Sequence, residues 1–199
     1  MPWFIDDVVA AGTLAGSPQP TIPAAGGLAL RPWQDDDAPV VLRAFQDPAV
    51  QRWHCRSADS WEEALGWIGE WRDAWRGERM ASWAVIGTDT GEVLGRVALR
   101  EIVLADGSAE LGYWMLPDTR GRGIAPRSVT ALTRWAFDEV GLHRLELLHA
   151  LGNDASCRVA AKAGFALEGT KRSALLHGDG WHDMHLHARV ADDPDPGTD

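Results

Sequence analysis

An apolar run, a loop rich in glycine and arginine, and an amphipathic segment follow one another between Ser108 and Gly141. The run "SAELGYWML" has the composition of a strand, and "APRSVTALTRWAFDEVG" places apolar residues at helical spacing up to a glycine suited to a C-cap. The loop "PDTRGRGIAPRS", residues 117–128, lies between them. Because such a loop turns main-chain N–H groups and a helix N-terminus toward one point, this order predicts an anion site, typically for phosphate.

Three familiar loops of this kind do not fit. A Walker A loop needs lysine and then serine or threonine after its last glycine, whereas Ile124 and Ala125 follow Gly123. The dinucleotide fingerprint GxGxxG is half met by Gly121 and Gly123, but Pro126 occupies the third glycine position and the preceding strand belongs to a meander. A disordered RNA-binding repeat is excluded because "RGRG" occurs once in an acidic chain. The alternative for this loop is a purely structural role, in which it is a glycine-rich turn that leads into the helix and binds no ligand.

The rest of the chain reads as one α/β (α+β) domain. Hydrophobic periodicity and turn residues predict a strand, two helices, three strands, a helix, a strand, a helix and two strands. These elements are expected within residues 28–33, 35–50, 57–75, 82–87, 92–103, 108–116, 125–141, 144–150, 153–164 and 165–190. We therefore expect an N-terminal extension over residues 1–26, a domain over 27–190 and a disordered acidic tail over 191–199.

Charge and cysteine content narrow the partners. The chain has 19 basic and 29 acidic residues, a net charge of -10, which argues against binding to nucleic acid or to an anionic membrane and suits an amine substrate. The two cysteines, Cys55 and Cys157, and the lack of a signal peptide or a long apolar run favour a cytoplasmic protein.

The loop resembles that of a known enzyme family. Arg120, Gly123 and Ala125 match the RxxGxA pyrophosphate loop of the GNAT superfamily of acyl-CoA-dependent N-acyltransferases. The segments "LGYWMLPDTRGRGIA", "WAFDEVGLHRLEL", "GNDASCRVAAKAGF" and "EGTKR" are similar to its ribosomal-protein N-terminal acetyltransferase (RimJ/RimL-like) branch. The resemblance implies the GNAT fold, a mixed and mostly antiparallel central sheet of about seven strands flanked by about four helices, from Leu28 to Val190.

The resemblance also implies acetyl-CoA as co-substrate, with no metal. The end of the strand before the loop would bind the pantetheine arm and polarise the thioester, and the loop would bind the pyrophosphate mainly through main-chain N–H groups that small side chains allow to come close. A helix starting at Asn153 would contribute an amide and a hydroxyl. The implied cofactor-binding residues are Trp114, Met115, Leu116, Arg120, Gly121, Arg122, Gly123, Ile124, Ala125, Pro126, Arg127, Asn153 and Ser156.

Two residues are candidates for proton transfer. Strand alternation places Glu110 on one face with Trp114 and opposite Tyr113, and the resemblance implies that Glu110 deprotonates the amine through water. A salt bridge or a solvated face is the alternative for Glu110. Ser156 is the candidate acid for the leaving thiolate, and a helix-capping motif with Asn153 is a compatible alternative. Tyr113, on the opposite face from Glu110, is in doubt as that acid.

A cysteine and a histidine-rich hairpin carry weaker signals. Cys157 adjoins Ser156 in sequence, but no histidine is near it in the chain, so a buried helix cysteine is expected rather than a nucleophile. The strand after His177 carries His182, His185 and His187. His182 and His185 point to opposite faces, and thiolate or carboxylate partners are not spaced for a closed zinc site, so no metal is predicted.

Tryptophans concentrate in the segment 57–75, which in this fold covers the acceptor cleft. Core packing is the expected role of most of them, but their apolar arc is wider than one sheet contact needs. We therefore expect one or two of them to contact an amine carried on an apolar or cyclic body, opposite the tip of the last hairpin. The predicted acceptor residues are Trp67, Trp71, Glu110, Trp181, His182 and Asp183.

Together these features predict an acetyl-CoA-dependent N-acetyltransferase that moves the acetyl group directly to a primary amine. The acceptor is either the α-amine of a protein or peptide N-terminus or a small molecule such as an aminated antibiotic or metabolite, because a fold does not choose between them. A non-catalytic acyl-CoA-binding module is the alternative from another class. The resemblance also suggests a homodimer.

Overall fold

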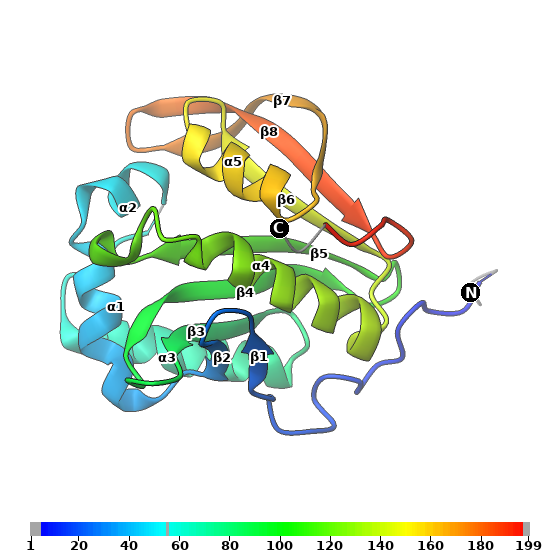
Figure 1. Cartoon of the computed structure of the whole chain (residues 1–199), viewed down its shortest axis with the longest axis horizontal. Helices are drawn as coiled ribbons and strands as arrows, with labels where there is room; N and C mark the ends of the chain where they lie inside the picture. Colours follow the sequence, from blue (N-terminus) through cyan, green and yellow to red (C-terminus); the bar gives the residue numbers. More distant parts are fainter. Residues whose placement is uncertain (1–4, 55, 197–199) are drawn as a thin grey trace.

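The computed structural model describes residues 5–54 and 56–196, which form one mixed sheet with helices on both faces (Figure 1). Within these residues the sheet has eight strands in the order β1-β2-β3-β4-β5-β6-β8-β7. Every neighbouring pair is antiparallel except β5 and β6. The predicted fold class is confirmed, with one strand more than expected.

The strands are β1 (Ile22–Ala24), β2 (Leu28–Pro32), β3 (Ala81–Gly87), β4 (Val93–Val103), β5 (Ser108–Met115), β6 (Arg144–Ala150), β7 (Ala166–His177) and β8 (Gly180–Val190). The α-helices are α1 (Ala38–Phe45), α2 (Pro48–Trp53), α3 (Trp61–Arg76), α4 (Ile124–Trp135) and α5 (Asp154–Lys162). Short helical turns are η1 (Asp35–Asp37), η2 (Pro117–Thr119) and η3 (Ala136–Val140), the last a π-helical continuation of α4.

The first predicted helix is two helices in the structure. The carboxylate of Asp47 accepts hydrogen bonds from the N–H groups of Ala49 and Val50, and Pro48 stands at the first position of α2. A cap and a proline at this point start a new helix, because both satisfy or remove N–H groups that a continuous helix would have used. The short α2 thereby turns Trp53 toward the centre of the molecule.

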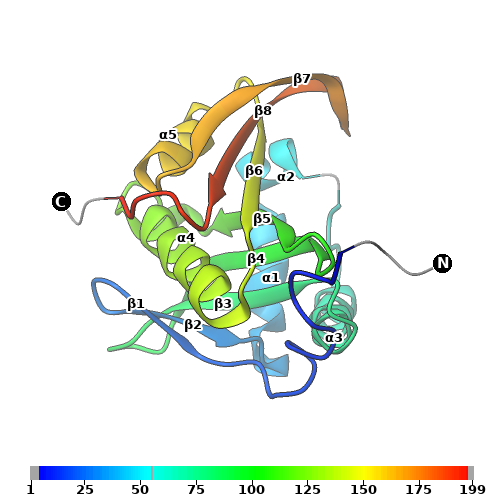
Figure 2. The same ribbon diagram turned by 90° about the vertical axis from the view of Figure 1, so that its right-hand side faces the viewer.

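Two apolar layers separate the faces of the sheet. Helix α4 covers one face, where Leu132 is buried with Val97, Leu99 and Leu111, and α1 and α3 cover the other (Figure 2). The wide apolar arc of α3 follows from this arrangement. The middle of α3 packs on the sheet face that α1 also covers. Trp75, near the end of α3, packs edge-on against Trp83 in the apolar layer beneath α4.

The described ends of the chain contact the domain. The N–H groups of Val8 and Val9 donate to the carbonyls after β4, and Leu14 is buried. At the other end, Asp195 forms ion pairs with Arg134 and Arg189. The last residues of the predicted tail, 197–199, lie outside the described residues.

The short parallel pairing of β5 and β6 shapes the centre of the sheet. Their register covers only three pairs, of which Glu110 with Glu146 is the last. Beyond it β5 stays with β4 as far as Met115, and β6 stays with β8 as far as Ala150. The two strands therefore splay, and main-chain groups of β5 face an opening instead of a neighbouring strand. No described helix is both long and apolar enough to cross a bilayer.

Candidate active site

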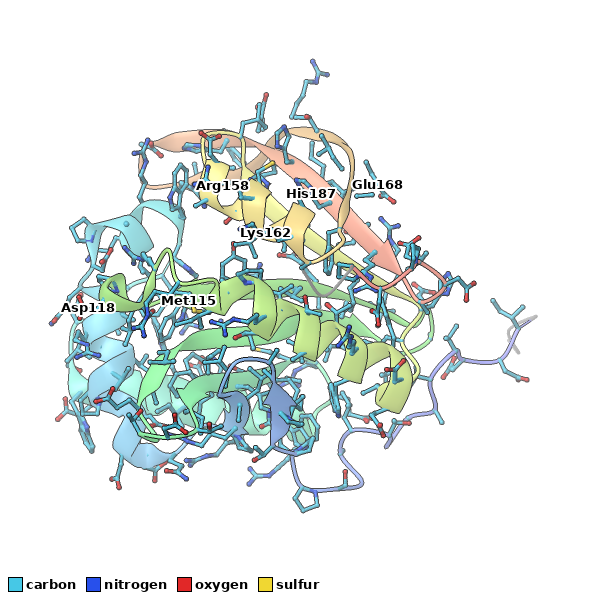
Figure 3. All side chains as sticks on the ribbon, viewed as in Figure 1. Met115, Asp118, Arg158, Lys162, Glu168 and His187 are labelled. Carbon is cyan, nitrogen blue, oxygen red and sulfur yellow. The ribbon has the colours of Figure 1, made fainter. Side chains whose placement is uncertain are left out.

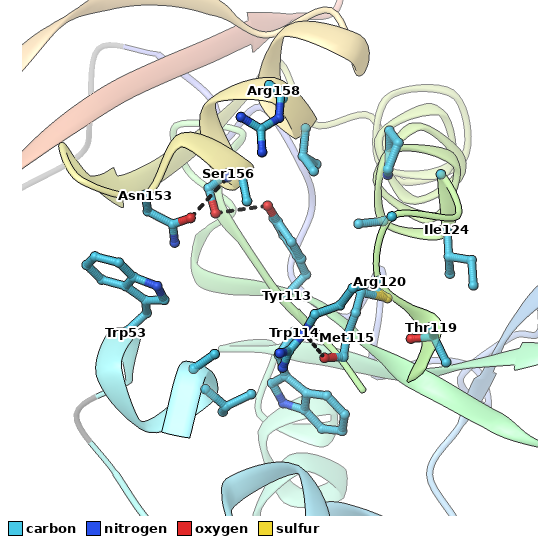
Figure 4. Close-up of a pocket in the computed structure, with 18 of the residues that line it drawn as sticks. Trp53, Tyr113, Trp114, Met115, Thr119, Arg120, Ile124, Asn153, Ser156 and Arg158 are labelled. Carbon is cyan, nitrogen blue, oxygen red and sulfur yellow. Dashed lines mark hydrogen bonds between the residues drawn. The ribbon is translucent and has the colours of Figure 1, made fainter. Parts of the chain in front are cut away.

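A cavity of about 450 Å³ lies where β5 and β6 separate. Figure 4 shows its walls, which are the end of β5, the loop into α4, the first turns of α5, and α2. It is lined by Ala49, Val50, Trp53, His54, Tyr113, Trp114, Met115, Thr119, Arg120, Gly121, Gly123, Ile124, Ala125, Pro126, Asn153, Ala155, Ser156, Arg158, Val159 and Lys162. Most of the predicted cofactor-binding residues thus come together at one cavity.

The N-terminus of α4 faces this cavity without a cap. Its N-cap residue is Gly123, which has no side chain to accept from the first N–H groups, whereas Asp47, Ser60 and Asn153 cap α2, α3 and α5. The first N–H groups of a helix have no partner within the helix and carry its positive dipole end. This terminus is therefore a ready site for an anion such as a diphosphate.

The loop glycines serve the backbone conformation. Gly121 and Gly123 have φ of +74° and +70°, in the left-handed region that favours glycine. We expected small side chains to be needed for close approach of the backbone to a ligand. A Cβ built on Gly121 meets nothing within 4 Å, so within the protein itself the turn of the chain, and not crowding, requires glycine.

The loop arginines are largely committed to the protein. Arg120 lines the cavity, but its Nε donates to the carbonyl of Met115 at 3.1 Å and its Nη1 lies 3.3 Å from the Asp47 carboxylate. The Arg127 guanidinium donates to main-chain carbonyls of Gly123 and Arg122, and neither Arg122 nor Arg127 lines the cavity. Their predicted contact with the cofactor is therefore not part of this cavity.

Two other cations line the cavity from the opposite wall. Arg158 and Lys162 lie four residues apart on α5, on the side that faces the N-terminus of α4 (Figure 3). Our sequence reasoning missed both of them. Their i, i+4 spacing on one helix face was the available signal.

The strand wall matches the prediction in two of three residues. Trp114 and Met115 line the cavity, and the buried Trp114 Nε1 has no hydrogen-bond partner among the described residues. Leu116 does not line the cavity, because it is buried and its N–H donates to the carbonyl of Leu94 at 3.0 Å. The predicted role of Leu116 in pantetheine binding therefore does not fit the structure.

Tyr113 and Ser156 meet across the opening. The Tyr113 hydroxyl donates to Ser156 Oγ at 3.0 Å, and both line the cavity (Figure 4). Burial raises the pKa of Tyr113 to about 12, with the hydrogen bond to Ser156 acting in the opposite direction, so the phenol is protonated at neutral pH. The Ser156 N–H donates to Asn153 Oδ1, so the capping interpretation of this motif is also correct.

Tyr113 lines the cavity although it lies opposite Glu110. Tyr113 does face away from Glu110, but its face of β5 is the one that looks onto the cavity. Glu110 does not line the cavity, and its carboxylate forms an ion pair with Arg100 on the opposite face. The salt-bridge alternative for Glu110 is thus the geometry present in this structure.

A half-buried histidine at the cavity was not predicted. His54 follows α2 and lines the cavity, and burial, followed by the positive charges of Arg96, Arg100 and His177, lowers its pKa to about 4. The imidazole is therefore neutral at pH 7. Part of this lowering of the His54 pKa comes from the positive charges of Arg96 and Arg100, which project from β4.

The predicted acceptor tryptophans have different surroundings. Trp67 packs edge-on against Phe45 and borders a second, open cavity of about 410 Å³. The residues around that cavity are Arg56, Ser57, Glu63, Gly66, Trp67 and Glu70. Trp71 packs against Trp33, with the Arg96 guanidinium over its ring, and borders neither cavity. Trp71 is therefore a core residue, and of these two tryptophans only Trp67 borders an open cavity.

The tip of the last hairpin lies outside the cavity. Trp181 is 66% exposed, and the Asp183 carboxylate accepts from the Ser173 N–H within the hairpin. His182 pairs with Asp179, and its ring centroid lies 6.3 Å from that of Trp53, which does line the cavity. Of the three predicted hairpin residues, His182 is thus the one that contacts the cavity wall.

Comparisons with known proteins agree on one family. The sequence profile of the acetyltransferase (GNAT) domain matches residues 28–166. An uncharacterised N-acetyltransferase of Bacillus subtilis, YoaA, is 26% identical over 164 residues, 82% of this chain and 93% of that relative. The ribosomal-protein-serine acetyltransferase of Escherichia coli is 31% identical over 101 residues, 51% of this chain and 56% of that relative. The structure of Mycobacterium smegmatis RimJ with a CoA-disulfide superimposes with a TM-score of 0.79 at 26% identity, covering 87% and 88% of the two chains.

Proposed function

Since the chain belongs to the acetyltransferase (GNAT) family and is an acetyl-CoA-dependent N-acetyltransferase, we propose that its acceptor is the α-amine of a protein or peptide N-terminus. Relatives named for ribosomal proteins support a peptide acceptor. The observation that carries the choice of an α-amine is that His54 lines the cavity close to the cations Arg96 and Arg100, which after burial contribute to lowering its pKa.

The cavity fits coenzyme A in chemistry as well as in position. The uncapped N-terminus of α4 would receive the diphosphate, with Arg158 and Lys162 adding charge from α5. The pantetheine arm would run between β5 and α5, where main-chain groups near Met115 and the amide of Asn153 are within the walls. The bound thioester supplies an activated acetyl group. The residues around it determine whether the attacking amine is neutral and which group protonates the leaving thiolate.

The positive field favours a neutral amine. Arg96 and Arg100 contribute to lowering the pKa of His54, and they would lower the pKa of an amine held beside it for the same reason. An α-amine has an ordinary pKa of about 8, whereas a lysine ε-amine has one of about 10.4. A modest shift therefore yields a neutral nucleophile at pH 7 only from the α-amine. Glu110 stays the predicted base on this side of β5.

The leaving thiolate meets a proton donor on the other side of the strand. Because the Tyr113 phenol is protonated and hydrogen-bonded to Ser156, one proton can pass from the serine hydroxyl to sulfur while tyrosine replaces it. A thiol has an ordinary pKa of about 8.5, so the product thiol keeps its proton at pH 7, and the tyrosinate left behind regains its proton from water. We propose that this pair acts as the general acid.

A panel of amines tests the choice of acceptor. The purified chain is given acetyl-CoA with peptides that have a free N-terminus, with the same peptides blocked at the N-terminus but carrying lysine, and with a polyamine. Released thiol and the mass of the product are measured. We expect acetylation of the free N-terminal peptides alone.

Other outcomes have definite meanings. Acetylation of lysine or of the polyamine at the same rate would refute the α-amine proposal. Acetylation of a small cyclic amine alone would favour the small-molecule alternative. Tight CoA binding with no thiol release from any amine would indicate a non-catalytic module. The cytoplasmic location stays part of this proposal, supported by the use of acetyl-CoA, and the homodimer stays a prediction.

A further inference from the structure

Three histidines and a cysteine converge beneath α5, outside the cavity. His149 is near the end of β6, and His185 lies directly opposite it on β8. His187 is two residues further along β8, and strand alternation places it on the same face. Cys157, in the second turn of α5, approaches them from above. One donor atom from each of these four residues lies within 4.8 Å of the others.

The sequence concealed this cluster. We excluded a metal because the histidines of the last hairpin lack a thiolate partner at the usual spacing. The structure brings that partner from another element, since α5 packs over β6 and β8 and places Cys157 beside the three rings. Spacing in the sequence therefore does not reveal that Cys157 lies beside these rings.

Hydrogen bonds define the tautomers of two of the rings. His149 Nδ1 lies 2.9 Å from the carbonyl of Ala150, and His187 Nδ1 lies 3.4 Å from the carbonyl of Phe165. A carbonyl only accepts, so Nδ1 of His149 carries hydrogen and donates, and the longer His187 contact is made in the same way when a metal takes both Nε2 atoms. In neutral rings both Nε2 atoms then present lone pairs. Histidines that bind metals are commonly oriented in this way, through the second ring nitrogen.

The two lone pairs point at each other. The Nε2 atoms of His149 and His187 are 3.2 Å apart, and the residues are only 5% and 3% exposed. Two lone pairs at this distance repel, so the pair needs either a hydrogen on one Nε2 or a cation between the two nitrogens. Two nitrogens bound to one tetrahedral zinc at about 2.0–2.1 Å are about 3.3 Å apart, which is close to the observed separation. The third ring adds a buried Nδ1, that of His185, without a hydrogen-bond partner among the described residues.

We propose that His149, Cys157, His185 and His187 bind one Zn²⁺ ion in a closed, four-coordinate structural site. Three imidazoles and one thiolate are a donor set that suits zinc, and four protein ligands leave no open position for catalysis. Binding releases one proton from the Cys157 thiol, which becomes a thiolate ligand, and involves no change of oxidation state.

The ion would hold α5 on the sheet. Ala160 is the only fully buried residue of this helix, so apolar packing contributes little to its position. A bond from Cys157 to zinc would join α5 to β6 and β8. The same helix begins with Asn153 and Ser156, so the ion would steady one wall of the cavity without taking part in acetyl transfer.

A second group of donors is the rival site. His177, Asp179 and His182 also lie within 4.8 Å of one another, at the tip of the last hairpin. This group has three donors, and Asp179 and His182 already pair with each other. Within residues 5–54 and 56–196 it has no fourth ligand for a closed zinc site, so we assign the ion to the cluster beneath α5.

Metal content and spectra of the full chain test the proposal. The protein is purified under reducing conditions, dialysed against zinc-free buffer and analysed for metal by mass spectrometry. It is then stripped with a chelator and titrated with Zn²⁺ or Co²⁺ alone. We expect one zinc per chain, a thiolate-to-cobalt absorption band in the near ultraviolet, and a melting temperature raised by about 5–10 °C at zinc about 100-fold above Kd.

Matched variants locate the ion. Cys157→Ser and His185→Ala should lose the zinc, and the serine variant should lose the thiolate band. Cys55→Ser and His143→Ala change the other cysteine and an exposed histidine outside both groups, and should keep one zinc per chain.

Several results would overturn the assignment. One is a purified protein that holds less than one tenth of an equivalent of zinc and shows no rise in melting temperature when zinc is added. The second is a Cys157→Ser variant that retains zinc. The third is loss of zinc from His182→Ala together with retention of zinc by His185→Ala. None of these measurements depends on acetyl transfer, so a wrong acceptor would leave them unchanged. If a cluster variant does not fold, the cobalt spectrum of the stripped wild-type chain still decides the point.

Discussion

Replacing Gly121 by alanine should weaken coenzyme A binding as well as the fold, whereas the same change at a glycine away from the cavity should weaken the fold alone. Gly121 has φ of +74°, and its missing Cβ would meet nothing within 4 Å. Alanine is therefore opposed by the left-handed backbone alone, which costs about 1–2 kcal/mol. In a chain of this length that corresponds to a fall in melting temperature of about 2–8 °C.

The loop can relieve that strain by leaving the left-handed region, which turns its N–H groups away from the diphosphate. Losing one hydrogen bond to a charged group costs about 1.5–3 kcal/mol, or about 10- to 150-fold in Kd. Gly121→Asn should bind more tightly than Gly121→Ala, because asparagine tolerates the left-handed conformation. The assay is isothermal titration of CoA into each purified variant.

Gly141 provides the matched control. It has φ of +82°, is also exposed, and also has nothing within 4 Å of a built Cβ, but it ends η3 away from the cavity. Gly141→Ala should show the same thermal loss with wild-type CoA affinity. If the alanine variants at Gly121 and Gly141 agree in CoA Kd within about twofold, the loop does not bind the diphosphate as argued.

Three further predictions concern catalysis and the acceptor. Tyr113→Phe and Ser156→Ala should each lower kcat about 100-fold at unchanged CoA Kd, and the double variant should lose little more because the pair acts as a unit. Burial raises the pKa of Tyr113 to about 12, so wild-type kcat should show no alkaline decline from this phenol up to about pH 10. Glu110→Gln should lower kcat with little change in acetyl-CoA affinity, and an unchanged pH–rate profile would remove Glu110 as the base. Trp67→Ala should raise acceptor KM about tenfold. Trp71→Ala should leave acceptor KM unchanged and lower the free energy of unfolding, measured in urea, by about 3–5 kcal/mol. If neither variant changes acceptor KM, these two tryptophans are excluded from the acceptor site.

Features that depend on neighbouring residues could be predicted from the sequence. The periodicity of the apolar residues predicted the positions of α4 and β5 along the chain. The glycines of the loop between them predicted an anion site. Asn153 was predicted as an N-cap and is one. The division of α1 from α2 was missed, although Asp47 and Pro48 are a local signal for it.

Features that depend on which elements meet could be decided only by the tertiary structure. Alternation correctly separated Tyr113 from Glu110, but which of the two faces opens onto the cavity depends on the splay of β5 from β6, and that splay has no local signal in either strand. Ser156 finds its partner 43 residues away in sequence, and Cys157 joins histidines from two different strands. A local pattern sets the direction of each side chain relative to its own backbone, whereas the packing of helices on the sheet sets which side chains meet.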